Sequence, residues 1–184
     1  MDRGVHRFSL NEVLRGSGGS KATVTKYFGD RMGLIAAVIG VEARETMAAL
    51  ILNDGQNGHQ PLQQGLARIL GGVLHFYLQP AALSLYRAVI ATAEQDAAST
   101  KAFYEGHGVV VDAIASFLAA RQGSDVREGL DCHAVAELLA HAIRAGLYER
   151  ALLNLEPLPI ADLAIAQQVD QTLTIFLRGV IASP

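Results

Sequence analysis

The sequence lacks the features that mark a secreted or membrane-spanning protein. It has no tryptophan and a single cysteine, Cys132, which excludes an internal disulfide and the zinc sites built from several cysteines. No uncharged apolar run approaches about eighteen residues. The first residues carry Asp2, Arg3 and Arg7 in place of the apolar stretch of a signal peptide. These absences predict a cytoplasmic protein that does not interact with membranes.

Catalytic signatures are also missing from the sequence. Nothing in it resembles a phosphate-binding loop, a nucleophile elbow or a dinucleotide-binding fingerprint, and the pair Gly18-Gly19 is typical of a turn. We therefore predict that the protein is not an enzyme and that it requires no cofactor.

Charged residues make up only 18% of the 184 residues, whereas hydrophobic residues make up 51%. A chain of this length can bury roughly 70% of the surface that it exposes when unfolded. The apolar surplus is typical of a protein with a large ligand pocket or a buried subunit interface.

The dominant pattern in the sequence is helical periodicity. After Arg31 no segment alternates apolar and polar residues for long enough to predict a strand, so we expect an all-α fold. Pro80 is expected to separate two helices, and Ser99 to cap a third. The last two helices are apolar on more than one face and are candidates for a dimeric four-helix bundle. The predicted helices cover about residues 32–52, 61–78, 82–95, 100–121, 132–153 and 160–181.

The segment 9–34 carries the most informative pattern. A short helix is predicted over residues 9–15, and the three glycines among residues 16–19 end it. Ser20 then stands at the N-cap position of a second short helix over residues 21–28. On this helix Val24 and Phe28 are expected to face inward. The outward face carries small, hydroxylic and cationic side chains, which suit base edges and phosphates in a major groove.

The charge of the chain is unevenly distributed. Residues 1–31 hold six basic and three acidic side chains, a net charge of +3, whereas the other 153 residues hold nine basic and fifteen acidic side chains, a net charge of −6. The positive charge is therefore concentrated beside the candidate recognition helix, which favours contact with nucleic acid.

Residues 16–34 resemble the DNA-binding signature of the tetracycline-repressor (TetR) family of transcriptional regulators. The resemblance covers the turn glycines, Ser20, the run that follows it, the pair Tyr27-Phe28 and Arg31; the family usually has Tyr where this sequence has Thr25. It implies a helix-turn-helix domain over residues 1–46, without the family's first helix, which would precede Gly4. The residues that it assigns to DNA contact are Lys21, Ala22, Thr23, Thr25, Lys26, Tyr27 and Arg31.

The resemblance also implies a helical ligand-binding and dimerisation domain over residues 47–184. The expected protein is a homodimeric repressor whose affinity for a double-stranded DNA operator is lowered by a small-molecule effector. Candidate pocket residues on the central helices are His75, Tyr86, Tyr104 and His107, with Tyr77 beside them. The alternative for each of them is a partly buried core residue whose polar end reaches water.

One further pattern is a stripe of three possible metal ligands. His133, Glu137 and His141 are spaced four residues apart, which places them on one helical face beside Cys132. Such a stripe more often forms a hydrated edge, so we predict no metal site.

Three alternative functions remain open at this stage. The first is a helical dimer that binds a small molecule but no longer binds DNA, because the first helix of the DNA-binding domain is missing. The second is a helical metalloprotein that uses the histidine stripe, and the third is a purely structural interaction module.

Overall fold

The computed structural model describes residues 20–29 and 60–179, together with positions 33–34, 37–38, 40–41, 44–45 and 48–49 between them. Within these ranges there is no strand and only an isolated bridge between Gln122 and Val126, so the all-α prediction is confirmed. The helices are α2 (Lys21–Phe28), α4 (Leu62–Tyr77), α5 (Pro80–Thr92), α6 (Ala97–Ala119), α7 (Cys132–Ala142), α8 (Leu147–Leu152) and α9 (Asp162–Phe176), followed by the 3-10 helix η2 (Leu177–Gly179).

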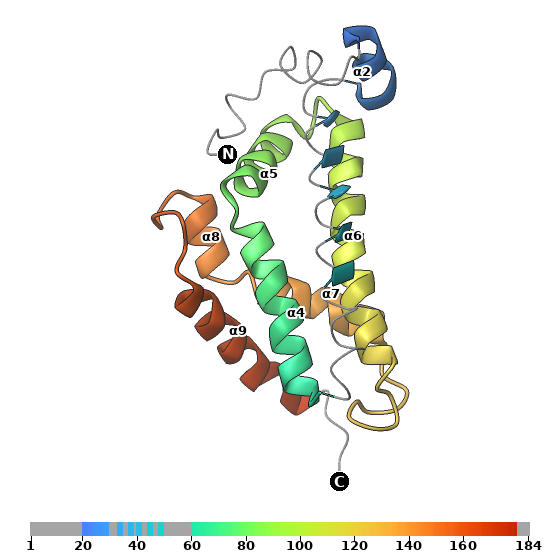
Figure 1. Cartoon of the computed structure of the whole chain (residues 1–184), viewed down its shortest axis with the longest axis vertical. Helices are drawn as coiled ribbons and strands as arrows, with labels where there is room; N and C mark the ends of the chain where they lie inside the picture. The colour runs from blue at the N-terminus through green and yellow to red at the C-terminus, as the bar shows by residue number, and fades with distance from the viewer. Residues whose placement is uncertain are drawn as a thin grey trace.

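Helix α4 lies at the centre of the larger group of helices (Figure 1). It packs against α9 on one side and against α5 and α6 on the other, and α6 in turn packs against α7. The short helix α2 lies at one end of the molecule, far from α9 (Figure 1). The described residues between positions 33 and 49 are helical and belong to the predicted helix over residues 32–52.

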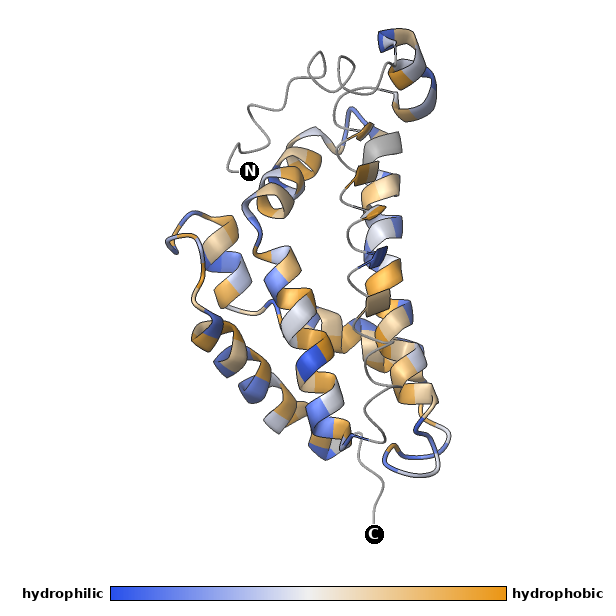
Figure 2. Ribbon diagram, viewed as in Figure 1, coloured by the Kyte–Doolittle hydropathy of each residue, from blue (hydrophilic) through white to orange (hydrophobic). Residues whose placement is uncertain are grey.

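The core is formed by apolar stripes with helical spacing. On α4, counting from Leu66, buried residues recur at the first, fourth, fifth, eighth and ninth positions. This spacing is the pattern of one buried helix face. Helix α6 supplies a matching stripe around Ile114, and α7 and α9 contribute Leu139 and Leu173. Apolar and polar residues alternate around these helices in Figure 2. The stripe on α4 consists of Leu66, Ile69, Leu70, Val73 and Leu74.

Two of the predicted helix starts are wrong. The chain breaks between α4 and α5 as expected, but α5 begins at Pro80 itself and not at residue 82, because the missing N–H of proline would have no helical partner there anyway. Ser99 is not a cap, because α6 begins two residues earlier at Ala97. The predicted short helix over residues 9–15 and the loop over residues 53–58 lie outside the described residues.

The predicted single helix over residues 132–153 is also wrong, because it is broken into α7 and α8. Gly146 stands at the break with φ +77° and ψ −75°, a backbone conformation that residues with a Cβ rarely adopt. Asp131 starts α7, and its Oδ1 accepts hydrogen bonds from the backbone N–H groups of His133 and Ala134 at 3.1 and 3.0 Å. The break changes the direction of the chain between Arg144 and Tyr148.

In the part of the chain that the structure describes, no helix has by itself the length and apolar composition needed to cross a membrane. By length and composition alone, only α4 and α5 taken together reach that level, and the two helices are bent by 67° relative to each other.

We predict opposite effects of alanine at two glycines. Gly146→Ala should lower the free energy of unfolding by about 1–3 kcal/mol, because the backbone there is strained for any residue with a Cβ. Gly71→Ala, within α4, should raise it by about 0.5–1 kcal/mol, since no atom lies within 4 Å of the added Cβ and alanine favours the helix. Urea denaturation of both variants measures the two changes, and equal effects would contradict the role assigned to Gly146.

Candidate DNA-binding helix and ligand pocket

Helix α2 begins and ends as the sequence predicts, at Lys21 and Phe28. The hydroxyl oxygen of Ser20 accepts a hydrogen bond from the backbone N–H of Thr23 at 3.1 Å, and the two hydroxyl groups are 2.9 Å apart. Gly29, with φ +75°, ends the helix and donates its N–H to the carbonyl oxygen of Thr25 at 3.1 Å. These local hydrogen bonds explain why eight residues form a defined helix at the end of the molecule.

The exposed face of α2 carries six of the seven residues predicted to contact DNA. Val24 is buried, as expected, whereas Phe28 is 39% exposed and does not face inward as predicted. It is the last residue of the helix, next to the turn at Gly29. Arg31 lies outside the described residues. The exposed residues are Lys21, Ala22, Thr23, Thr25, Lys26 and Tyr27.

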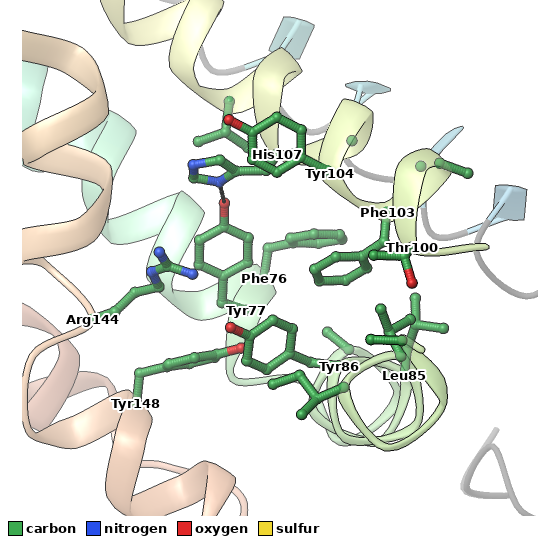
Figure 3. A pocket seen from close by; sticks show the side chains of 18 of the residues that line it. Phe76, Tyr77, Leu85, Tyr86, Thr100, Phe103, Tyr104, His107, Arg144 and Tyr148 are labelled. Carbon is green, nitrogen blue, oxygen red and sulfur yellow. Dashed lines mark hydrogen bonds between the residues drawn. The ribbon is translucent and has the colours of Figure 1, made fainter. Parts of the chain in front are cut away.

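A cavity of about 340 Å³ lies between α4, α5, α6 and the turn that joins α7 to α8. Its wall is mostly aromatic and aliphatic, with a few polar groups (Figure 3). One lining residue, Gly40, belongs to the helical positions that follow α2 in the chain. The remaining lining residues include Phe76, Tyr77, Leu85, Tyr86, Val89, Ile90, Thr100, Phe103, Tyr104, Gly106, His107, Val110, His141, Arg144 and Tyr148.

The aromatic side chains of the pocket contact one another. The rings of Tyr86 and Phe103 are 5.2 Å apart between centroids, and Tyr148 is 6.0 Å from both Tyr77 and Tyr86. These separations fall within the range of favourable aromatic pairs. The hydroxyl oxygen of Tyr77 points at His107 and lies 3.2 Å from its Nδ1 (Figure 3). The pocket wall is therefore a connected aromatic surface with hydrogen-bonding groups at defined points.

Burial shifts the pKa values of three polar side chains of the pocket. Burial raises the pKa of Tyr77 to about 12, although the nearby Arg144 opposes this shift. Burial also raises the pKa of Tyr148, so both phenols stay protonated near neutral pH. Burial lowers the pKa of His107; Arg144 and His141 lower it further, while Glu137 raises it. Among the described lining residues, only Arg144 has a permanent charge, and its guanidinium carbon is 5.8 Å from the ring centroids of both tyrosines.

The structure brings most of the predicted pocket residues together. Tyr86, Tyr104 and His107 line the cavity, and Tyr104 is 67% exposed at its rim. His75 does not line it but borders a separate hollow between α4 and α9, where its Nδ1 is 3.9 Å from Asp162. That any of these residues binds a ligand stays a prediction.

Sequence reasoning missed Arg144 and Tyr148, which join the pocket through the turn between α7 and α8. A signal for Arg144 was present, because it is the only charged residue in the otherwise apolar run from Leu138 to Tyr148 apart from His141. Its position at the pocket depends on the break at Gly146, which the periodicity did not reveal.

The predicted histidine stripe is divided in the structure. The Nε2 of His133 is 3.5 Å from Oδ1 of Asp112, away from the other two members. Glu137 and His141 instead meet His107 of α6, and one possible ligand atom from each of the three lies within 4.8 Å of the others.

The structure thus combines a short exposed helix that carries two lysines with a pocket in the helical body whose wall is mostly aromatic and aliphatic. A family model described as "AefR-like transcriptional repressor, C-terminal domain" matches residues 64–179, which is more than half of the chain. The chain therefore belongs to the TetR family of transcriptional regulators. No curated protein sequence matches the chain.

Solved structures share the fold. A proposed TetR-family regulator from Mesorhizobium loti is 20% identical with a TM-score of 0.73, over 97% of this chain and 89% of that one. The flavonoid-responsive regulator FrrA is 22% identical with a TM-score of 0.64, over 100% of this chain and 91% of that one. A further proposed TetR-family regulator, from a Rhodococcus species, is 19% identical with a TM-score of 0.61, over 96% of this chain and 91% of that one.

Arg87 of α5 connects two walls of the pocket. Its Nε donates to the carbonyl oxygen of Leu152 at 2.6 Å, and its Nη2 donates to the carbonyl oxygen of Ala151 at 2.7 Å and to Oδ1 of Asn154 at 2.8 Å. Carbonyl groups at the end of a helix lack helical partners, so a charged donor there stabilises the end of α8.

We predict that Arg87→Ala lowers the free energy of unfolding by about 1.5–3 kcal/mol, the value of a hydrogen bond to a charged group. The control is Lys101→Ala, because Lys101 is exposed and contacts only Glu105, at 3.6 Å, among the interactions described. The control should change the free energy of unfolding by less than about 0.5 kcal/mol. Chemical denaturation measures both, and a neutral Arg87→Ala would contradict the role of this residue in joining α5 to α8.

Proposed function

We propose that this protein is a homodimeric transcriptional repressor that leaves its DNA operator when a small molecule occupies the pocket. The observation that carries the proposal is the position of Gly40. This residue lines the pocket and is one of the described helical positions that follow α2 in the chain. A ligand in the pocket therefore contacts the part of the chain that connects to the candidate DNA-binding helix.

The surface of α2 supports DNA binding. Lys21 and Lys26 are exposed, so neither cation is neutralised within the protein body. The hydroxyl groups of Thr23 and Thr25 and the methyl group of Ala22 form a small, polar surface that can approach base edges. In this proposal these three residues contact the DNA bases, and the DNA phosphates are contacted by Lys21, Lys26, Tyr27 and Arg31.

Exposed apolar side chains on the last helices and on the segment between α8 and α9 support a dimer. Among the described residues, six large exposed hydrophobic side chains lie between the start of α7 and the end of α9. A second copy of the chain would cover such a surface and bring two α2 helices to one side. The six residues are Leu138, Leu153, Leu155, Leu158, Leu163 and Ile175.

The pocket supports a flat aromatic effector that carries phenolic or anionic oxygen atoms. Its rings provide stacking surfaces, while Tyr77 and Tyr148 keep their protons and Arg144 supplies a positive charge. FrrA, one of the solved structures with this fold, is a flavonoid-responsive regulator. We extend that ligand class to this chain on the strength of the aromatic lining.

The mechanism is a shift between two arrangements of the dimer. Two recognition helices read successive major grooves when they lie about 34–36 Å apart. An effector that binds better to an arrangement with another spacing reduces the population that is competent to bind DNA. The segment that contains Gly40 is the connection through which the pocket changes that spacing. A repressor must be located in the compartment that holds the DNA, which agrees with the expected cytoplasmic location.

Selection of duplexes from a random library by the purified chain tests the DNA-binding function. We expect enrichment of a two-fold symmetric sequence whose half-sites are about 10 base pairs apart or a multiple of that distance. Lack of enrichment would contradict the repressor and favour a dimer that binds a small molecule without binding DNA.

We predict that Lys26→Ala weakens binding to the selected duplex and flattens its dependence on salt. Loss of one phosphate contact per subunit should reduce the slope of log K against log salt concentration by about 0.9 for each bound subunit. Lys101→Ala is the matched control, because Lys101 is the only other lysine besides Lys21 and lies on α6. Fluorescence anisotropy at several salt concentrations gives both slopes, and identical slopes for the two variants would remove Lys26 from the interface.

A second prediction concerns the pocket. Gly106→Leu should fill the cavity and weaken the binding of flavonoids and simple phenols by at least about tenfold, or about 1.4 kcal/mol. Gly108→Leu is the control, because Gly108 is on the same helix but does not line the cavity. Apart from the helix's own backbone, no atom lies within 4 Å of a Cβ added at either glycine, and circular dichroism checks that both leucine variants remain helical.

Titration calorimetry with a panel of flavonoids and single-ring phenols measures the affinity of each variant. Equal losses in Gly106→Leu and Gly108→Leu would show that the cavity is not the binding site. If no member of the panel binds the unmodified chain, the proposed class of effector is wrong.

A further inference from the structure

A cluster of three possible metal ligands forms part of the pocket wall and has no role in the proposed function. His107 comes from α6, whereas Glu137 and His141 lie on successive turns of α7. Oε1 of Glu137 is 3.8 Å from Nε2 of His107 and 4.0 Å from Nδ1 of His141. The two imidazole rings meet edge to face, with centroids 5.1 Å apart. Three groups that commonly bind metals therefore converge from two helices.

The hydrogen bond of His141 leaves a nitrogen available for a metal. Nδ1 of His141 is 2.8 Å from the backbone carbonyl oxygen of Glu137. A carbonyl oxygen can only accept, so Nδ1 carries the proton and Nε2 keeps its lone pair. A metal-bound histidine usually donates its other ring N–H to a carbonyl or carboxylate oxygen in this way.

His107 is arranged in the same manner. Its Nδ1 is 3.2 Å from the hydroxyl oxygen of Tyr77, which can accept a hydrogen bond from the ring N–H (Figure 3). Its Nε2 is buried and has no hydrogen-bond partner among the described residues. A buried nitrogen without a partner is unfavourable, and a bound cation would satisfy it.

We propose that His107, Glu137 and His141 bind one divalent transition-metal ion, for which Zn²⁺ is the test ion. Two imidazoles and one carboxylate form a known set of three protein ligands for zinc, with a fourth position left open. Imidazole ligands disfavour Mg²⁺ and Ca²⁺, which prefer oxygen. Because His107 and His141 both line the cavity, the ion would lie at the pocket wall, within reach of a bound ligand.

The cluster can contract to the required size. Zinc bonds of about 2.0–2.2 Å place tetrahedral ligand atoms roughly 3.3 Å apart, closer than the present limit of 4.8 Å. The side chains of Glu137 and His141 are 37% and 52% exposed, so surrounding atoms leave room for small changes in their torsion angles, whereas that of His107 is 12% exposed. Arg144 acts against the site, because its positive charge repels a cation.

The test measures Zn²⁺ affinity of the purified, chelator-stripped chain by competition with a chromogenic chelator at pH 7.5. We expect one saturable site per chain. Glu137→Gln and His141→Ala should each weaken it roughly 100-fold, because each removes a ligand. His133→Ala is the matched control and should keep the unmodified affinity, since His133 lies on the same helix but pairs with Asp112.

Two further variants separate a metal site from general damage to the fold. Tyr77→Phe should weaken Zn²⁺ binding about tenfold, because the ring of His107 loses its hydrogen-bond acceptor. Arg144→Gln should strengthen Zn²⁺ binding, which misfolding cannot explain. Circular dichroism before and after each titration confirms that the variants remain helical.

Three results would overturn the proposal. The first is the absence of a saturable Zn²⁺ site in the unmodified chain. The second is an equal loss of Zn²⁺ affinity in His133→Ala and His141→Ala, which would mean that the ion binds only to exposed side chains along α7. The third is unchanged affinity in His107→Ala. None of these measurements involves DNA, so their failure would leave the repressor function untouched.

Discussion

The buried face of α4 is the constraint on which the rest of the structure depends. Its apolar stripe packs against α9 on one side and against α5 and α6 on the other, which places this helix at the centre of the molecule. The helix has one orientation in which this stripe is buried. In that orientation Phe76 and Tyr77, in its last turn, line the cavity. Burial of apolar surface therefore also fixes the chemistry of the pocket.

The pocket combines this apolar framework with a small number of polar groups. Tyr77 contacts His107, which in turn lies against Glu137 and His141, while Arg144 carries the permanent charge. Low polarity around these groups shifts the pKa values of Tyr77 and His107 in the directions that keep both side chains neutral. The proposed effector site and the proposed metal site therefore share one wall of the pocket, because His107 and His141 line the cavity and also meet Glu137.

The family match and the candidate DNA-binding helix concern different parts of the chain. Residues 64–179 match the family model, and they carry most of the pocket. The assignment of α2 to DNA rests on its cap, its length and its exposed cations. Gly40 lies between the two parts in the sequence and lines the pocket, and the proposed coupling between ligand and DNA depends on this position.

Several elements were predictable from the sequence because their causes are local. Ser20, the periodicity of α2 and the stripe of α4 act within a few residues of one another, and the structure has these helices where they were expected. The starts at Pro80 and Ala97 and the break at Gly146 were predicted wrongly. At each of them more than one local conformation is compatible with the residues, and packing selects between these conformations.

The sequence by itself determined that the chain is helical, where its positive charge gathers and how α2 is capped, since these follow from spacing, composition and short-range hydrogen bonds. Only the tertiary structure decided which histidine joins Glu137 and His141. His107 is thirty residues from Glu137 in the chain, and only the packing of α6 on α7 brings it there in place of His133. Side chains that meet across two helices depend on the direction and rotation of both, which no periodicity within one helix contains.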